Sequence, residues 1–295
     1  MPHAALSSTQ EALTLEDYFH VACQHLKKHA IENPANEAYT ILSHLLNKDI
    51  AFIISRFKET IHDGFSKDSF WEILNRRSQN EPMAYIFGER EFFGKNFSVG
   101  PGVLIPRPET EHLLEWVMED HVQKPFTHGI DLCTGSGIIG LCLGEELSIP
   151  FECVDTSDEA LQWTRKNLEQ RVNFKGDIHK MDILTDLPGK LGKVDLITMN
   201  PPYIPSADIH HLSNDVKDFE PHLALDGGVS GLEFLDMALK EIQSIAQIGC
   251  HLYLELGFGQ KEILSSINLN SWKLEGWRDD LAGIPRIAKL TFLSE

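Results

Sequence analysis

The chain has few cysteines and a shortage of positive charge. Its 26 lysines and arginines face 44 acidic residues, which gives a net charge of −18. A protein that holds nucleic acid mainly through phosphates needs a basic face, so this composition argues against direct nucleic-acid binding as the main activity. The scattered cysteines form no C-x-x-C pair, and they indicate free thiols in a reducing compartment rather than a disulfide framework. They are Cys23, Cys133, Cys142, Cys153 and Cys250.

Long apolar runs are also missing. No segment approaches the ~20 apolar residues that span a bilayer, so no membrane association is expected. Residues Met1 to Ser8 have neither the basic start nor the apolar core of a signal peptide. His210 and His211 are the only adjacent histidines, and neighbours along a chain seldom bind one metal together, so no metal site is expected. These features predict a cytoplasmic protein.

The chain is long enough, at 295 residues, for two domains. Residues 1–85 have apolar residues at helical spacing in the segments 14–30, from Pro34 to Leu46 and from Ser66 onward, and Thr14 with Asp17 predicts a helix cap. This region is interpreted as a small helical bundle that packs or docks a partner. Residues 86–108 are interpreted as a linker, with a β-hairpin that breaks at Gly94 to Asn96 and a proline-rich stretch.

Residues 109–295 alternate between strand and helix patterns. A helix is expected to begin at Glu109 and extend to Val117, and a short strand is expected to end near Asp182. The other strand candidates are 128–133, 150–155, 194–199, 250–256 and 287–293, and the helix candidates are 138–147, 158–171 and 231–246. Such alternation predicts an α/β fold with a mainly parallel, doubly wound sheet.

The segment from Ile130 to Gly140 is predicted to be a strand, a tight loop and a helix start. Gly135 and Gly137 let the backbone turn sharply, and the first N–H groups of the helix face the loop. Asp155 ends the next predicted strand and can accept hydrogen bonds from both hydroxyls of a ribose. The glycine spacing fits a dinucleotide site, and, with Asp131 before it, fits an S-adenosylmethionine site equally well.

Two further strand ends carry candidate site residues. Asp182 and Ile183 are candidates to bind an adenine amino group and to cover its face, although Asp182 could also simply cap a turn. Asn200-Pro201-Pro202-Tyr203 follows the apolar strand 194–199, and the consecutive prolines end that strand. Ligands bind at this edge of an open α/β sheet. A carboxamide, backbone carbonyls and an aromatic ring there suit a planar NH2 group, which favours methyl transfer over nicotinamide chemistry.

These motifs resemble those of the release factor glutamine methyltransferases, the PrmC/HemK family, over nearly the whole chain. The most specific one is Ile105 to Glu111, which reads Ile-Pro-Arg-Pro-Glu-Thr-Glu. The others are Tyr85 to Gly88, Glu91 to Gly94, Val103-Leu104, Asp131 to Gly137, Asn200 to Tyr203, Glu220-Pro221, Ala224-Leu225, Gly227-Gly228, Gly231-Leu232, Glu255 to Gly257 with Gln260, and Asp280 to Arg286.

The resemblance implies a seven-stranded, Rossmann-like methyltransferase domain behind a helical domain. It implies S-adenosylmethionine as the methyl donor and S-adenosylhomocysteine as the product. The implied acceptor is the glutamine of the Gly-Gly-Gln motif in class 1 peptide chain release factors, held by Asn200, Pro201, Pro202 and Tyr203. The residues expected to contact the donor are Asp131, Cys133, Thr134, Gly135, Ser136, Gly137, Asp155, Asp182, Ile183 and Asn200.

The chain departs from the family pattern at Cys133 and Ile183. Cys133 replaces the first glycine of the usual loop, so the backbone there is expected to keep a negative φ; Ile183 stands where an aromatic residue is common. Arg107, Glu109, Glu111 and Arg286 are assigned no firm role, although a hinge is favoured over partner contact for the first three. The alternative activities are an adenine-directed nucleic-acid methyltransferase and a non-catalytic assembly module.

Overall fold

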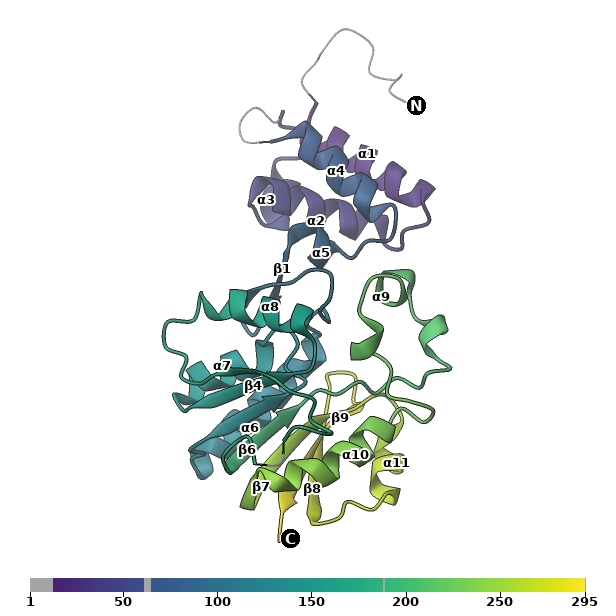
Figure 1. Ribbon diagram of the computed structural model, residues 1–295. Helices are drawn as coiled ribbons and strands as arrows, with labels where there is room; N and C mark the ends of the chain where they lie inside the picture. The colour runs from purple at the N-terminus through teal and green to yellow at the C-terminus, as the bar shows by residue number, and fades with distance from the viewer. Residues whose placement is uncertain (1–12, 61–64, 188, 295) are drawn as a thin grey trace. The chain divides into compact units, whose positions relative to one another are not determined.

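The computed structural model describes residues 13–60, 65–187 and 189–294 (Figure 1). The prediction that residues 1–8 do not form a signal peptide therefore concerns a segment outside the described residues. The chain divides into two compact units, residues 1–87 and 88–295. The hairpin and the proline-rich stretch belong to the second unit. Within the described residues, none of the helices combines the length and apolar character needed to cross a bilayer.

The first unit is helical, as its apolar spacing predicts. Helix α1 (Leu15–Lys28) begins with a capping box in which the Thr14 side chain accepts from Asp17 N and the Asp17 carboxylate accepts from Thr14 N. Helices α2 (Pro34–Leu46) and α4 (Lys67–Arg77) pack with α1 around Leu26, Leu42 and Phe70, which are fully buried. The short helices α3 (Ile50–Ser55) and α5 (Met83–Phe87) are additional to the predicted segments.

The second unit opens with a hairpin of strands β1 (Glu89–Phe92) and β2 (Lys95–Ser98). The predicted break at Gly94 to Asn96 starts one residue late and ends two residues late, because the turn is Phe93-Gly94 and both residues have positive φ. A two-residue turn of this kind matches the twist of the strands, so pairing resumes at Lys95. The helix predicted from Glu109 starts as a 3-10 turn, η1 (Pro108–Thr110), which leads into α6 (Glu111–Gln123).

The main sheet has seven strands in the order β5-β4-β3-β6-β7-β9-β8. Strands β3 (Gly129–Leu132), β4 (Phe151–Asp155), β5 (Ile178–Lys180), β6 (Val194–Met199) and β7 (Ala246–Glu255) are parallel, and β8 (Trp272–Asp279) and β9 (Pro285–Phe292) complete the sheet in antiparallel pairs. The predicted α/β fold with a mainly parallel sheet is confirmed.

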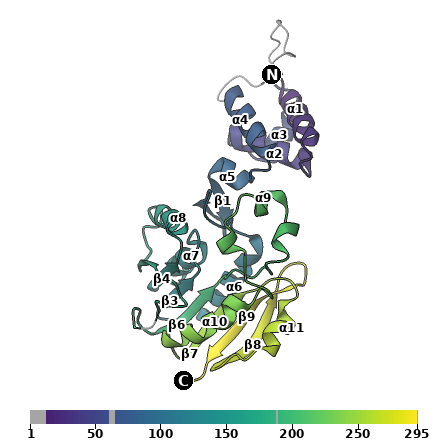
Figure 2. The same cartoon turned by 45° about the vertical axis from the view of Figure 1, so that its right-hand side comes forward.

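Helices cover both faces of this sheet (Figures 1 and 2). Side chains alternate along β3, so Ile130 and Leu132 face the layer of α10 (Glu233–Glu241) and α11 (Gln260–Ser266). The opposite face carries α6 and α7 (Ile138–Leu147), together with the end of α8 (Asp158–Leu168). The helix predicted to reach residue 246 is too long. Helix α10 is followed by the 3-10 turn η4 (Ile242–Ser244), and β7 begins after Ile245, whose carbonyl accepts from Val194 N.

The topology sets the place of the site. Strands β3 and β6 are neighbours, yet the chain leaves β3 toward β4 on one side and later returns to β6 on the other. Leu132 pairs in register with Met199, so the glycine loop and Asn200 leave the sheet side by side. Such a switch point at the carboxyl ends of parallel strands is where open α/β sheets bind ligands. The segment between β6 and α10 adds the short turns η2 (Ile209–His211), α9 (Asn214–Lys217) and η3 (His222–Ala224).

Candidate active site

A cavity opens at this switch point within the second unit. Of the residues predicted from the sequence, those on its wall are Cys133, Thr134, Gly135, Ser136, Asp155, Asp182, Ile183, Asn200 and Pro202. Asp131, Gly137, Pro201 and Tyr203 are described by the structure but do not line it. Further lining residues that sequence reasoning did not single out for the site include Met181, Leu223 and Phe234. The described residues contain no cluster of three or more His, Cys, Asp or Glu side chains suited to a metal ion.

The loop after β3 winds through three left-handed residues. Gly135 and Gly137 have φ of 59° and 84°, and Cys133 has φ of 58°, so the expectation of a negative φ at Cys133 is wrong. A side chain in this region costs roughly 1–2 kcal/mol, which neighbouring bonds must offset. Thr134 N donates to the Val154 carbonyl at 3.0 Å, and Gly137 N donates to the Thr134 carbonyl at 2.9 Å. Both bonds are made by Thr134, so the residue that follows Cys133 is fixed and holds the turn.

Asp131 lies beneath the loop and is fully buried. Its Oδ2 accepts from Thr134 Oγ1 at 2.5 Å and from Gly140 N at 3.2 Å, while its Oδ1 accepts from Thr198 Oγ1 at 2.7 Å. Gly140 has no space for a side chain, because a Cβ there would lie 2.7 Å from Cys153 Sγ and 3.0 Å from Asp131 Cβ. Asp131 therefore fixes the loop from below and joins β3 to β6 and α7.

Burial raises the pKa of Asp131 to about 7, against the opposing effect of the Thr134 and Thr198 hydroxyls and the Gly140 N–H. An acid with a raised pKa binds its proton more tightly in the folded chain than in the unfolded one. Its contribution to the free energy of unfolding should therefore be greatest below about pH 4, the unfolded value, and should decline as pH rises toward 7. We expect urea unfolding at several pH values to show a shallower decline for Asp131→Asn, which cannot titrate; equal slopes would contradict this.

Asp155 ends β4 on the cavity wall. Its Oδ2 accepts from Gly135 N and its Oδ1 accepts from Ser157 N, each at 2.9 Å. Burial raises its pKa, although these backbone donors act in the opposite direction. Each carboxylate oxygen can accept more than one hydrogen bond, so the side chain can shape the glycine loop and still accept hydroxyl groups of a ligand.

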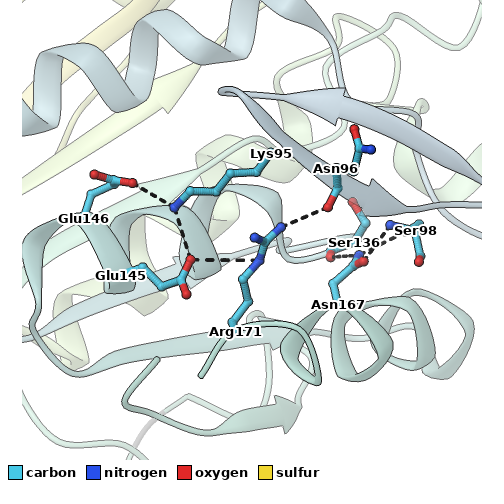
Figure 3. A network of polar contacts seen from close by, with 8 residues as sticks. All are labelled: Lys95, Asn96, Ser98, Ser136, Glu145, Glu146, Asn167 and Arg171. Atoms are coloured by element: carbon cyan, nitrogen blue, oxygen red, sulfur yellow. Dashed lines mark hydrogen bonds and ion pairs between the residues drawn. The ribbon is translucent and has the colours of Figure 1, made fainter. Parts of the chain in front are cut away.

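Helix α8 supports the glycine loop through two of its side chains. Thr164 Oγ1 donates to the Gly135 carbonyl at 2.7 Å. The Asn167 amide donates to the carbonyls of Ser136 at 2.9 Å and Ser98 at 3.0 Å, and its Oδ1 accepts from Ser98 N at 2.6 Å (Figure 3). Asn167 is almost fully buried, so one side chain joins α8, the loop and strand β2.

Ion pairs extend this network toward α7. Lys95 Nζ lies 3.1 Å from Glu145 Oε2 and 2.8 Å from Glu146 Oε1, and Arg171 donates to the Asn96 carbonyl at 3.0 Å (Figure 3). The hairpin is thus attached to both helices that flank the loop.

Asn167→Ala should lower the free energy of unfolding by about 2 kcal/mol, since unpaired buried polar groups cost roughly 1–3 kcal/mol. The substitution leaves the Ser98 and Ser136 backbone groups without their amide partner. Urea unfolding of the full chain measures the change, and Gln162→Ala on the exposed side of α8 is the matched control. A variant as stable as the control would contradict this role.

Asp182 and Ile183 follow β5. Both line the cavity, and Ile183 is buried in the core beneath it. Asp182 Oδ1 accepts from Leu184 N at 2.9 Å, so it does cap a turn as well as face the cavity. Its contact with an adenine remains a prediction.

Asn200 to Tyr203 leave β6 as an extended loop. The described residues place no hydrogen-bond partner on the Asn200 carboxamide or on the Pro201 carbonyl. Tyr203 is anchored instead, with its hydroxyl 3.4 Å from Glu255 Oε1 and its carbonyl accepting from Gln260 Nε2 at 2.7 Å. The first half of the motif thus has unused acceptors, and the second half is fixed to the protein.

Residues Ile105 to Glu111, the run most specific to the resemblance, contribute to the cavity wall. Arg107 lines the cavity and pairs with buried Glu220 at 2.6 Å, and Glu220 also accepts from Ile105 N at 3.0 Å. Thr110 donates to Glu255 Oε2 at 2.6 Å. Burial raises the pKa of both Glu220 and Glu255. Arg286 pairs with Asp280 at 3.1 Å, and its positive charge acts on Glu255 in the direction opposite to burial.

Family models match both units of the chain. The model described as "PrmC N-terminal domain" matches residues 17–88, and the model described as "Methyltransferase small domain" matches residues 110–218. The second match includes the glycine loop, Asp155 and the Asn-Pro-Pro-Tyr motif.

Curated relatives are similar over nearly their whole length. The chain is 36% identical over 271 residues to the release factor glutamine methyltransferase of Clostridium botulinum, which covers 90% of this chain and 94% of the relative. It is 34% identical over 280 residues to that of Koribacter versatilis, covering 93% and 97%, and 35% identical over 292 residues to that of Nitratidesulfovibrio vulgaris, covering 95% of each. The chain therefore belongs to the release factor glutamine methyltransferase family.

Proposed function

We propose that this chain transfers a methyl group from S-adenosylmethionine to the side-chain amide nitrogen of the Gly-Gly-Gln glutamine in class 1 release factors. The observation that supports this most directly is the unused carboxamide of Asn200 on the cavity wall, next to the unused carbonyl of Pro201, beside a glycine loop at the switch point. Membership of the family and the printed names of its members agree with this activity.

The cavity wall fits the methyl donor in charge and shape. Its charged side chains are Arg107, already paired with Glu220, and the carboxylates Asp155, Asp182 and Asp226. This acidic surplus favours a positively charged ligand. Asp155 offers acceptors for ribose hydroxyls, and Ile183 offers an apolar surface for a flat ring. S-adenosylmethionine, when bound, supplies an electrophilic methyl group on a positively charged sulfur.

The protein acts on the acceptor by orienting it. A glutamine amide nitrogen is a poor nucleophile because its lone pair is delocalised into the carbonyl. The Asn200 side-chain oxygen and the Pro201 carbonyl each accept one amide N–H, which favours the partial positive charge that develops on nitrogen. They also aim the lone pair toward the donor, and such positioning accounts for up to ~7–11 kcal/mol of barrier lowering. Tyr203 packs beside the amide, and the product nitrogen afterwards gives its proton to water.

Mass spectrometry of the release factor tests the proposal. After incubation with enzyme and S-adenosylmethionine, we expect one added methyl group on the Gly-Gly-Gln peptide and none when that glutamine is replaced by alanine. Duplex DNA serves as a second acceptor in a parallel reaction. Methylation of DNA without methylation of the release factor would instead support the adenine-directed alternative.

A further inference from the structure

Gln260 is a buried side chain behind the Asn-Pro-Pro-Tyr motif that the proposed mechanism does not use. It is the first residue of α11 and is 4% exposed. It does not line the described cavity, and its amide is bonded to the protein's own backbone. A buried amide needs hydrogen-bond partners for its N–H groups and its oxygen, so its partners identify the segments that it connects.

The Gln260 amide joins three separate segments. Nε2 donates to the Tyr203 carbonyl at 2.7 Å and lies 3.4 Å from the Gly231 carbonyl. Oε1 accepts from Gly257 N at 2.8 Å. The side chain therefore connects the end of the Asn-Pro-Pro-Tyr motif to the turn before α10 and to the turn after β7.

The backbone around these bonds is packed without space for side chains. A Cβ at Gly231 would lie 2.4 Å from the Tyr203 carbonyl oxygen and 2.7 Å from Gln260 Nε2. A Cβ at Gly227 would lie 2.8 Å from the Pro202 carbonyl oxygen. Ile204 N also donates to the Leu225 carbonyl, and Gly227 N to the Ile204 carbonyl, each at 2.9 Å. The position of Tyr203 is thus determined by direct backbone contact.

We propose that Gln260 is a positioning residue for methyl transfer, acting through the Tyr203 carbonyl on the acceptors of Asn200 and Pro201. The inference rests on the proposed function. Pro201 and Pro202 have fixed φ angles, so a shift at Tyr203 is passed on to Asn200 with little local compensation. Small misplacements of reacting groups cost rate steeply. Loss of the Gln260 N–H should therefore lower the rate of transfer without removing any contact to S-adenosylmethionine.

The test compares Gln260→Met with Gln243→Met in the full-length enzyme. Gln243 makes the same kind of bond, from its amide to the Leu239 carbonyl at 3.2 Å, and it is not on the cavity wall. Single-turnover methylation of a release factor is measured at saturating concentrations, and calorimetry gives the Kd for S-adenosylmethionine. We expect Gln260→Met to be roughly tenfold slower with a Kd within about threefold of wild type, and Gln243→Met to be unchanged in both.

Gln260→Leu provides a second variant of similar size. Its side chain has no group that can donate to the Tyr203 carbonyl, so transfer should be slowed at least as much as in Gln260→Met. A wild-type rate in either variant would overturn the inference, as would a matched loss of cofactor affinity and rate. A wild-type enzyme that methylates no release factor would instead refute the proposed function itself.

Discussion

Asn200→Ala is expected to lower the single-turnover rate of release factor methylation by roughly 100–1,000-fold, the usual cost of removing one preorganised polar group from the site of developing charge. Asn200 stands directly after β6, and within the described residues no protein group uses its carboxamide. Alanine removes one of the two acceptors proposed for the glutamine NH2, so the nitrogen is held at one point and its lone pair is no longer aimed.

Cofactor binding distinguishes this role from a general one. Calorimetry should give a Kd for S-adenosylmethionine within about tenfold of wild type, because the lost contact is made chiefly to the acceptor. Asn173→Ala, at an exposed position after α8, is the matched control and should leave rate and affinity unchanged. Near-normal turnover of Asn200→Ala would remove the basis of the mechanism.

The second large effect is expected for Asp155→Ala. It should weaken S-adenosylmethionine binding by roughly 1.5–3 kcal/mol, which is about 10–150-fold, because hydrogen bonds to a charged group are of this size. The carboxylate also accepts from Gly135 N and Ser157 N, so the variant loses support for the loop as well as the acceptors proposed for ribose. Isothermal titration of the full-length protein measures the affinity.

A stability measurement separates these contributions of Asp155. If the side chain only shapes the loop, the urea midpoint will fall while the Kd stays unchanged, and the assignment to ribose will be refuted. If it binds the ribose, the affinity will fall by more than the loss of stability explains. Gln162→Ala on the neighbouring helix gives the baseline for both measurements.

Local pattern was sufficient for the elements that hold the site. The apolar periodicity predicts strand 194–199 and helix 138–147 with the bounds that the structure has. The two prolines, which cannot donate to a strand ladder, likewise predict that β6 ends before Pro201, as it does in the structure. These elements carry their signal within a few residues, so no tertiary contact is needed to locate them.

The errors occur where distant contacts decide. Strand β8 was not predicted, because its register shifts between Leu274 and Gly276 and the apolar alternation is interrupted there. The positive φ of Cys133 depends on bonds to neighbouring strands and loops, which no local pattern contains. The place of Asp131 is likewise set by a distant residue, because its partner Thr198, 67 residues away, holds the carboxylate beneath the loop. Its contact with the cofactor stays a prediction.

The acidic lining of the cavity has a consequence for repeated turnover. Methyl transfer would convert the proposed donor, a sulfonium ion, into a neutral thioether, so the attraction of the acidic cavity wall for the bound molecule as a whole should weaken once the reaction is complete. We therefore expect these carboxylates to favour entry of fresh reagent over retention of the spent molecule.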